Sequence, residues 1–250
     1  MNPKKTVLAA MSAALLIPLA ACGSKDSGTT ITVFAASSLT TTFTELGSEF
    51  EAAHPGVHVT FSFGGSSDLV SSIQGGAGAD VFASADTKNM DALTQDGTAT
   101  DPKDFATNVL EIATPPGNPA HVTSFADLGK PGVKVVICAD GVPCGTAAAT
   151  MEQQTGVTIH PVSEEQSVTD VLGKVESGDA DAGLVYVTDV TAAGSKVTGV
   201  PFKESKEVVN TYPIAVLKDS SQAATAQQFV DFVLGAQGQK VLKDAGFGQP

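Results

Sequence analysis

Apolar residues along this chain recur at two different spacings. Between residues 57 and 63 every second residue is apolar, which is the pattern of a β-strand with one buried face. Between residues 39 and 50 apolar residues recur every three or four positions, as on one face of an α-helix. The Pro55-Gly56 pair that follows would end this helix.

The same two patterns alternate along most of the chain. Strands are predicted at 31–35, 57–63, 80–84, 109–114, 133–138 and 182–187, and an extended segment at 210–217. Helices are predicted from residue 39 to the break at 54–56, around 69–73, at 87–95, 146–154 and 168–175, and in one terminal helix around 229–234. Strands that alternate with helices predict an α/β architecture with mostly parallel sheets.

A Pro-rich loop at 115–119 interrupts this alternation. It follows the strand predicted at 109–114 and cannot continue as helix or central sheet. We therefore predict two lobes, with the ligand cleft between them and two extended crossings acting as a hinge. The predicted boundaries are 31–108 plus 210–250 for one lobe and 109–209 for the inserted lobe.

The N-terminus has the features of an export signal. Lys4 and Lys5 precede an apolar run at 7–21 that is too short and interrupted for a membrane span. The run ends in Leu-Ala-Ala-Cys, which resembles the lipobox of bacterial lipoproteins. This predicts a signal peptide at 1–21, lipidation of Cys22, a flexible tether at 22–30 and a location on the outer face of the cell membrane. The alternative is an ordinary signal peptide with a coincidental Cys.

Composition narrows the class of ligand. The formal net charge is −13 at pH 7, which argues against nucleic acid as a partner. The chain has no Arg and no Trp, and its two Tyr are Tyr186 and Tyr212. Arg is the usual clamp for carboxylates and phosphates, and flat aromatic side chains suit sugars and quaternary amines. Amino-acid, sugar and choline binding are therefore disfavoured.

Two further cysteines, Cys138 and Cys144, lie in the short segment CADGVPC. Outside the cell membrane this spacing favours a disulfide, and the alternative is a pair of free buried thiols. A zinc site is disfavoured because no second Cys pair or suitably spaced His pair accompanies them. His54 and His58 flank the helix-breaking Pro55-Gly56, so they also give no metal site.

Two strand-to-helix junctions, ITVFAASSLT and FGGSSDL, both place a Ser pair where a helix begins. The first turn of a helix has unpaired N–H groups and a partial positive charge, so it can hold an anion without a charged side chain. Ser adds a hydroxyl donor, and Gly lets the backbone approach closely. Each junction alone is also explained by plain helix capping, whereas two matched junctions favour a shared ligand.

Together with GADVFASAD, VPCGTA, QSVTDVL, AGLVY and YPIAVL, these junctions give the chain a family resemblance. It resembles the molybdate-binding proteins of bacterial ABC importers over residues 31–247. The resemblance implies a type II periplasmic-binding-protein fold that closes on a tetrahedral oxyanion and passes it to an ABC permease. It implies no cofactor and no enzyme activity, with molybdenum as cargo, tungstate as a second ligand, and a monomer held to the membrane only by its lipid.

The resemblance also implies which residues contact the ion. These are the hydroxyls of Ser38, Ser66 and Tyr186 and the backbone amides of Cys144 and Val168. The family's frequent Ala is replaced by Cys at 144, but only the amide is needed there. Each residue has a plainer alternative. The serines would cap helices, Val168 would be a core residue, Tyr186 would bond to backbone, and Cys144 would matter for its sulfur.

A donor-only site suits a fully deprotonated dianion, since the O–H of protonated phosphate would need an acceptor. Asp68 and Asp170 lie beside contact positions, where we expect them to act as helix caps. The nearest alternative function is a sulfate or thiosulfate binder. A thiol hydrolase using Cys144 with His121 or His160 is a weaker alternative, and FGGSSDL lacks the G-x-S-x-G motif of serine hydrolases. A purely structural surface lipoprotein is the third.

Overall fold

The computed structural model describes residues 28–250, so the predicted signal peptide and Cys22 lie outside the described residues. Strands are β1 (Thr29–Ala36), β2 (Val57–Gly64), β3 (Val81–Ala83), β4 (Lys103–Thr114), β5 (Val135–Cys138), β6 (Ser163–Glu165), β7 (Ala182–Tyr186), β8 (Thr198–Val200) and β9 (Val209–Val216). Helices are α1 (Thr40–Ala53), α2 (Ser66–Gln74), α3 (Thr87–Gln95), α4 (Pro143–Thr155), α5 (Val168–Glu176), α6 (Val187–Ala193), α7 (Ala223–Leu234) and α8 (Ala236–Asp244), with short 3-10 helices between them. Over residues 28–250 no helix is long and apolar enough to cross a membrane.

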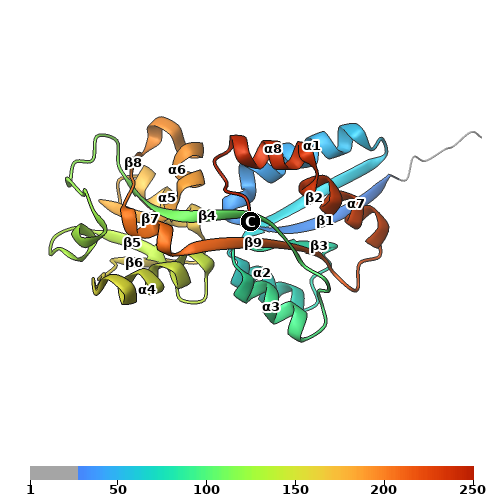
Figure 1. Cartoon of the computed structure of the whole chain (residues 1–250), viewed down its shortest axis with the longest axis horizontal. Helices are drawn as coiled ribbons and strands as arrows, with labels where there is room; N and C mark the ends of the chain where they lie inside the picture. The colour runs from blue at the N-terminus through green and yellow to red at the C-terminus, as the bar shows by residue number, and fades with distance from the viewer. Residues whose placement is uncertain (1–27) are drawn as a thin grey trace, which may run out of the picture.

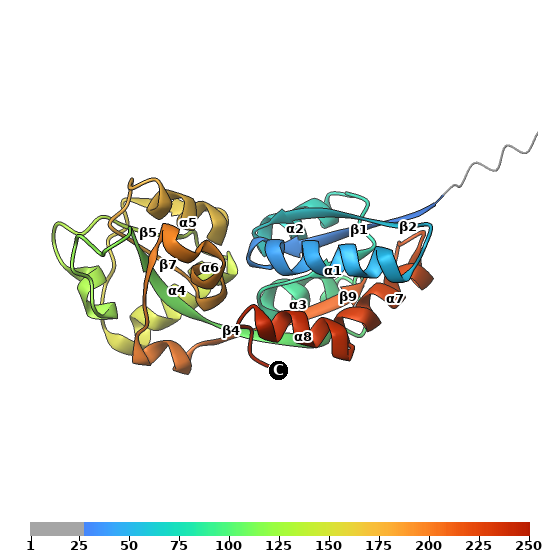
Figure 2. The ribbon, with the colours of Figure 1, turned by 90° about the horizontal axis from the view of Figure 1, so that it is seen from above.

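The elements form two groups, which we call the first and the second lobe (Figure 1). The first lobe contains β1–β3, α1–α3, α7 and α8, and the second contains β5–β8 and α4–α6. Strands β4 and β9 run from one lobe to the other, so the strand order β2-β1-β3-β9-β4-β7-β5-β6 is continuous through the molecule. Figure 2 shows the same two groups from above.

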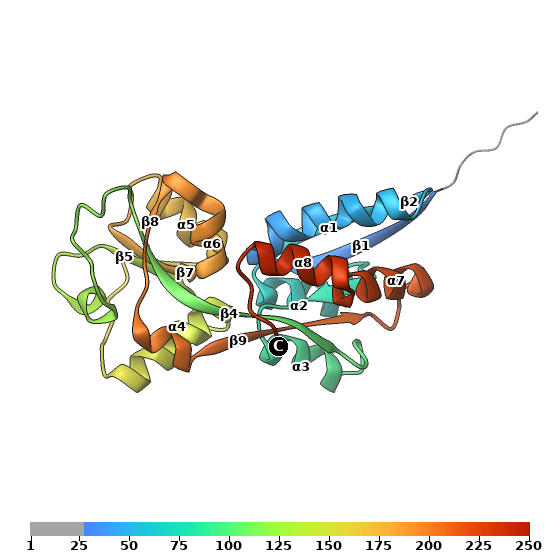
Figure 3. The same ribbon diagram turned by 45° about the horizontal axis from the view of Figure 1, so that its top comes forward.

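The first lobe is a sheet covered by helices on both faces. Helices α1, α7 and α8 lie on one face, and α2 and α3 lie on the other (Figure 3). Because successive strand residues point to opposite faces, Val33 of β1 packs in the core beside α1 while Phe34 packs beside α2. Phe43 of α1 packs against the rings of Phe105 and Phe229.

The second lobe has a single core of buried residues between Leu110 and Phe202. Strand β7 lies between β4 and β5, and β6 lies at the edge beside β5. Helices α4 and α5 both pack against β5 and β7. The starts of these two helices lie close to the ends of the strands. The helix starts therefore face the first lobe.

The two crossing strands pair with each other between the lobes. Asn108 and Val109 of β4 lie opposite Asn210 and Val209 of β9. The predicted lobe boundaries fall within this paired stretch, and as boundaries they stay a prediction. Strands β4 and β9 run antiparallel to each strand with which they pair, so the prediction of mostly parallel sheets is wrong for this part of the fold.

Helix α6 and the short strands β6 and β8 were not predicted, and Val187, predicted as the end of a strand, begins α6. Among the elements that were predicted, three boundaries differ most. Thr29 and Thr30, placed in the tether, belong to β1 because they pair with Val57 and His58. Strand β4 begins at Lys103, six residues early, because the mostly polar stretch 103–108 pairs with β9. The predicted terminal helix ends at Gly235, whose backbone is extended, and a separate α8 follows. The α/β class itself is confirmed, since helices cover both faces of the sheet.

Candidate functional site

A small hollow lies where the two lobes meet, and we call it the interlobe hollow. It is lined by Ala36, Ser37, Ser38, Gly64, Gly65, Ser66, Ala85, Val142, Pro143, Cys144, Val168 and Tyr186. The five residues predicted as contacts, Ser38, Ser66, Cys144, Val168 and Tyr186, are all in this lining. They come from five separate segments, because β1, β2 and β7 end here and α4 and α5 begin here.

The hydroxyls of Ser38 and Ser66 in the first lobe do not cap the helices that begin there. The N-cap positions are Ala36 and Gly65, and neither makes a side-chain capping bond. Ser66 Oγ instead accepts a hydrogen bond from the Ala85 N–H at 3.1 Å, and Ser38 Oγ lies 3.0 Å from the Tyr212 hydroxyl. The capping alternative is therefore wrong for both serines.

The second lobe contributes two helix starts. Cys144 and Val168 lie in the first turns of α4 and α5, where backbone N–H groups have no partner within the helix. The side chains are used elsewhere. Cys144 is joined to Cys138 in a disulfide, and Val168 is buried in the core of the second lobe. Ser167 caps α5, since its Oγ accepts a hydrogen bond from the Asp170 N–H at 3.2 Å and donates to the Asp170 carboxylate at 2.7 Å. The cap is therefore Ser167, and not Asp170 as was predicted.

Tyr186, at the end of β7, is the third hydroxyl. Its side chain is buried, and its oxygen accepts a hydrogen bond from Asn210 Nδ2 at 3.0 Å. The alternative of a bond to backbone does not apply, since the partner is a side chain. Burial raises the pKa of Tyr186 well above its usual value, so the hydroxyl keeps its proton and remains a hydrogen-bond donor.

The lobes are in direct contact around the hollow. Asn89 of α3 donates a hydrogen bond across the gap to the Gly141 carbonyl at 3.3 Å. The backbone of Gly65 approaches the second lobe so closely that a Cβ placed there would lie 2.1 Å from the Gln166 carbonyl oxygen. The structure therefore represents a closed arrangement of the lobes.

The hollow is small and uncharged. Its cavity volume is about 10 Å³, which is far below the usual size of a site for a drug-sized molecule. Among the residues that line it none carries a charge. Within residues 28–250 no group of His, Cys, Asp and Glu is arranged to hold a metal cation. The hollow therefore suits a compact ligand held by neutral donors.

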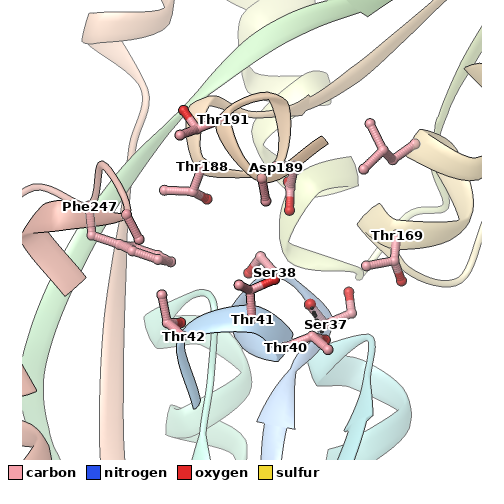
Figure 4. A pocket seen from close by; sticks show the side chains of 13 residues that line it. Ser37, Ser38, Thr40, Thr41, Thr42, Thr169, Thr188, Asp189, Thr191 and Phe247 are labelled. Atoms are coloured by element: carbon pink, nitrogen blue, oxygen red, sulfur yellow. Dashed lines mark hydrogen bonds between the residues drawn. The ribbon is translucent and has the colours of Figure 1, made fainter. Parts of the chain in front are cut away.

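A larger cavity of about 300 Å³ adjoins the hollow and shares Ser37 and Ser38 with it. Figure 4 shows Thr188, Asp189 and Thr191 of α6 on the side of this cavity opposite Ser38. Asp189 is buried at the start of α6, where its carboxylate accepts a hydrogen bond from the Tyr186 N–H at 2.8 Å. Burial raises the pKa of Asp189 to about 7.

This buried carboxyl predicts a pH dependence of folding stability. Folded Asp189 keeps its proton up to about pH 7, whereas the unfolded chain releases it near the ordinary pKa of 3.8. The folded state then binds more protons between these values, so stability falls as the pH rises from about 4 to about 7. Asp189→Asn should reduce this fall by up to roughly 4 kcal/mol, at about 1.4 kcal/mol per pKa unit.

Urea unfolding at several pH values measures this effect. Asp91→Asn, at an exposed position of α3, is the matched control and should leave the profile of the original chain unchanged. If Asp189→Asn and the original chain have parallel profiles, Asp189 is ionised in the folded state throughout this range.

The sequence prediction missed several residues at this site. Asn210 and Tyr212 lie in the predicted extended segment NTYPIAVL, of which only YPIAVL belongs to the family pattern, and the sequence gives neither residue a role. Gly65 was taken only as part of a junction that exposes backbone. The sequence did contain one indication for Asn210, because it is a polar residue in a mostly apolar extended segment.

Comparisons with known proteins agree with this arrangement. Residues 31–248 match the family model described as bacterial extracellular solute-binding protein. The molybdate-binding protein of Mycobacterium tuberculosis is 49% identical over 251 residues, covering 96% of each chain. The periplasmic molybdate-binding protein of Azotobacter vinelandii superposes with a TM-score of 0.78 at 24% identity, covering 88% of this chain and 99% of that one. The sulfate-binding protein SubI of Mycobacterium tuberculosis gives 0.76 at 21% identity, covering 88% and 86%. The predicted periplasmic-binding-protein fold is confirmed.

Proposed function

Because this chain belongs to the bacterial extracellular solute-binding protein family, we propose that it captures molybdate between its lobes and delivers it to an ABC permease. The observation that carries this proposal is the set of neutral donors around the interlobe hollow. The hydroxyls of Ser38, Ser66 and Tyr186 and the amides of Cys144 and Val168 all line it. The close relative named as a molybdate-binding protein supports the choice of ion.

Neutral donors are sufficient for a doubly negative ion. Each hydrogen bond to a charged group contributes about 1.5–3 kcal/mol, so several together offset much of the cost of removing water from the ion. Fixed amides and hydroxyls in a closed site also bind more strongly than the same groups in water. Because the ion bridges both lobes, its binding favours the closed arrangement over an open one.

Two alternative functions receive less support. Sulfate would use the same donors, and the fold resemblance to a sulfate-binding protein keeps it as the second candidate. The thiol hydrolase would need a free thiolate at Cys144, but this sulfur is bonded to Cys138. His121 and His160 are exposed, and neither lines the hollow. We therefore propose a binding protein without catalytic activity.

The proposal also includes a cellular location, a lipid anchor and a second ligand. Membership of an extracellular family supports a location outside the cytoplasm. The N-terminal sequence supports a lipid anchor on Cys22. We also propose that the protein acts as a monomer. Tungstate has the same shape and charge as molybdate, so we expect it to bind as well.

Isothermal titration calorimetry of residues 23–250 without a tag tests the proposal, with molybdate, tungstate, sulfate and phosphate in parallel. We expect molybdate and tungstate to bind tightly and sulfate and phosphate to bind far more weakly. Ligand at 100 times its dissociation constant should also raise the free energy of unfolding by about 2.7 kcal/mol. Tighter binding of sulfate would move the function to sulfate capture, and binding of none of the four would refute oxyanion capture.

A further inference from the structure

Asn210 lies on the crossing strand β9 and contacts both lobes. Its side-chain nitrogen donates one hydrogen bond to the Ala85 carbonyl of the first lobe at 2.9 Å. It donates a second to the Tyr186 hydroxyl of the second lobe at 3.0 Å. The residue is buried, so water does not compete strongly for these bonds. One amide group therefore connects a backbone carbonyl in one lobe with a ligand-facing hydroxyl in the other.

The chemistry of these partners fixes the direction of both bonds. A carbonyl oxygen can only accept, so the Asn210 side chain must present its NH₂ rather than its oxygen to Ala85. The two hydrogens of that NH₂ are then used by Ala85 and by Tyr186. As a result the Tyr186 oxygen is an acceptor toward Asn210, and its own proton is left to be donated elsewhere.

The other two hydroxyls predicted as contacts also have partners within the protein. Ser66 Oγ accepts from the Ala85 N–H, which leaves the Ser66 proton for the hollow. Ser38 Oγ lies 3.0 Å from the hydroxyl of Tyr212, a second residue of β9. The hydroxyls of Ser38, Ser66 and Tyr186 thus each have a protein partner. The arrangement of Tyr186 depends on the lobes being closed, because Ala85 and Tyr186 belong to different lobes.

We propose that Asn210 is a positioning residue that makes the Tyr186 hydroxyl an obligatory donor to the bound ion, and so favours tetrahedral oxyanions that carry no proton. This inference rests on the proposed function. Without Asn210, no donor occupies this lone pair of the Tyr186 oxygen, so the hydroxyl can turn and present a lone pair to the oxyanion, which repels it. The ligand class is therefore set partly by a residue that is absent from the lining of the hollow.

A double-mutant cycle tests this role, with Asn210→Leu, Tyr186→Phe and the combined variant titrated with molybdate. We expect Asn210→Leu alone to weaken binding by at least about tenfold, the scale of one hydrogen bond to a charged group. In the Tyr186→Phe background the same change should weaken binding by less than about twofold. A loss of equal size in both backgrounds would overturn the proposal, because a merely structural effect of Asn210 does not depend on the Tyr186 hydroxyl.

Asn210→Ala provides a second cycle if Asn210→Leu does not fold. It removes both N–H donors without adding a charge, so the same dependence on Tyr186 is expected. Thermal unfolding without ligand shows whether each variant is folded. If the original chain binds no molybdate, the proposed function fails. If it binds molybdate and the two changes are additive, only the role of Asn210 fails.

Discussion

Gly65→Ala is expected to weaken molybdate binding by about 10- to 100-fold without unfolding the protein. The added Cβ would lie 2.1 Å from the Gln166 carbonyl oxygen of the opposite lobe, so the closed arrangement must loosen. Extra atoms forced into a packed contact typically cost about 1–3 kcal/mol, and about 1.4 kcal/mol changes affinity tenfold. The backbone of Gly65, at φ −62° and ψ 137°, is one that Ala adopts readily. The cost therefore falls on closure and not on the fold of the first lobe.

Gly78→Ala is the matched control for this experiment. Gly78 is exposed in the same lobe, and a Cβ placed there would meet nothing within 4 Å. Calorimetric titration should give this variant the affinity of the original chain. Equal affinities for Gly65→Ala and the original chain would mean that the ion does not require the contact between Gly65 and Gln166.

The site residues that could be predicted from the sequence are those that lie at a recognisable strand end or helix start. Ser66 follows an alternating strand and two glycines, and Val168 begins a periodic helix, so both positions are visible in a short window. The family resemblance then assigned them a common ligand. Their meeting in one hollow follows from the strand order, which brings the ends of β1, β2 and β7 together.

The parts that were missed depend on contacts between distant residues. Asn210 donates to Ala85, 125 positions away, and nothing in the segment NTYPIAVL indicates which group its amide meets. Gly65 is an ordinary turn glycine in the sequence, and its close approach to Gln166 exists only because the lobes meet. The antiparallel pairing of β4 with β9 was missed for the same reason, since mostly polar residues become a strand through a distant partner.

We expect the missed contacts and the predicted donors to act together in binding. Gly65 and Asn89 allow and stabilise the approach of the lobes, and Asn210 orients a hydroxyl only when that approach has occurred. A ligand that needs donors from both lobes therefore receives all of its hydrogen bonds only in the closed state. In the proposed function, this coupling gives the permease a structural difference to recognise between loaded and empty protein.

Ser66→Ala is expected to lower both molybdate affinity and the stability of the ligand-free protein. The variant loses one donor to a charged ligand, worth about 1.5–3 kcal/mol, which corresponds to roughly a 10- to 150-fold weaker affinity. In the original chain the Ala85 N–H donates a hydrogen bond to Ser66 Oγ at 3.1 Å. The variant leaves this N–H without an acceptor, which should lower the free energy of unfolding by about 1–3 kcal/mol.

Ser67→Ala is the matched control, because Ser67 is half-buried in the same helix turn but does not line the hollow. The free energy of unfolding of this variant should change by less than about 0.5 kcal/mol. Calorimetry and urea unfolding of both variants separate the two effects, and equal molybdate affinities for Ser66→Ala and Ser67→Ala would remove Ser66 from the binding site.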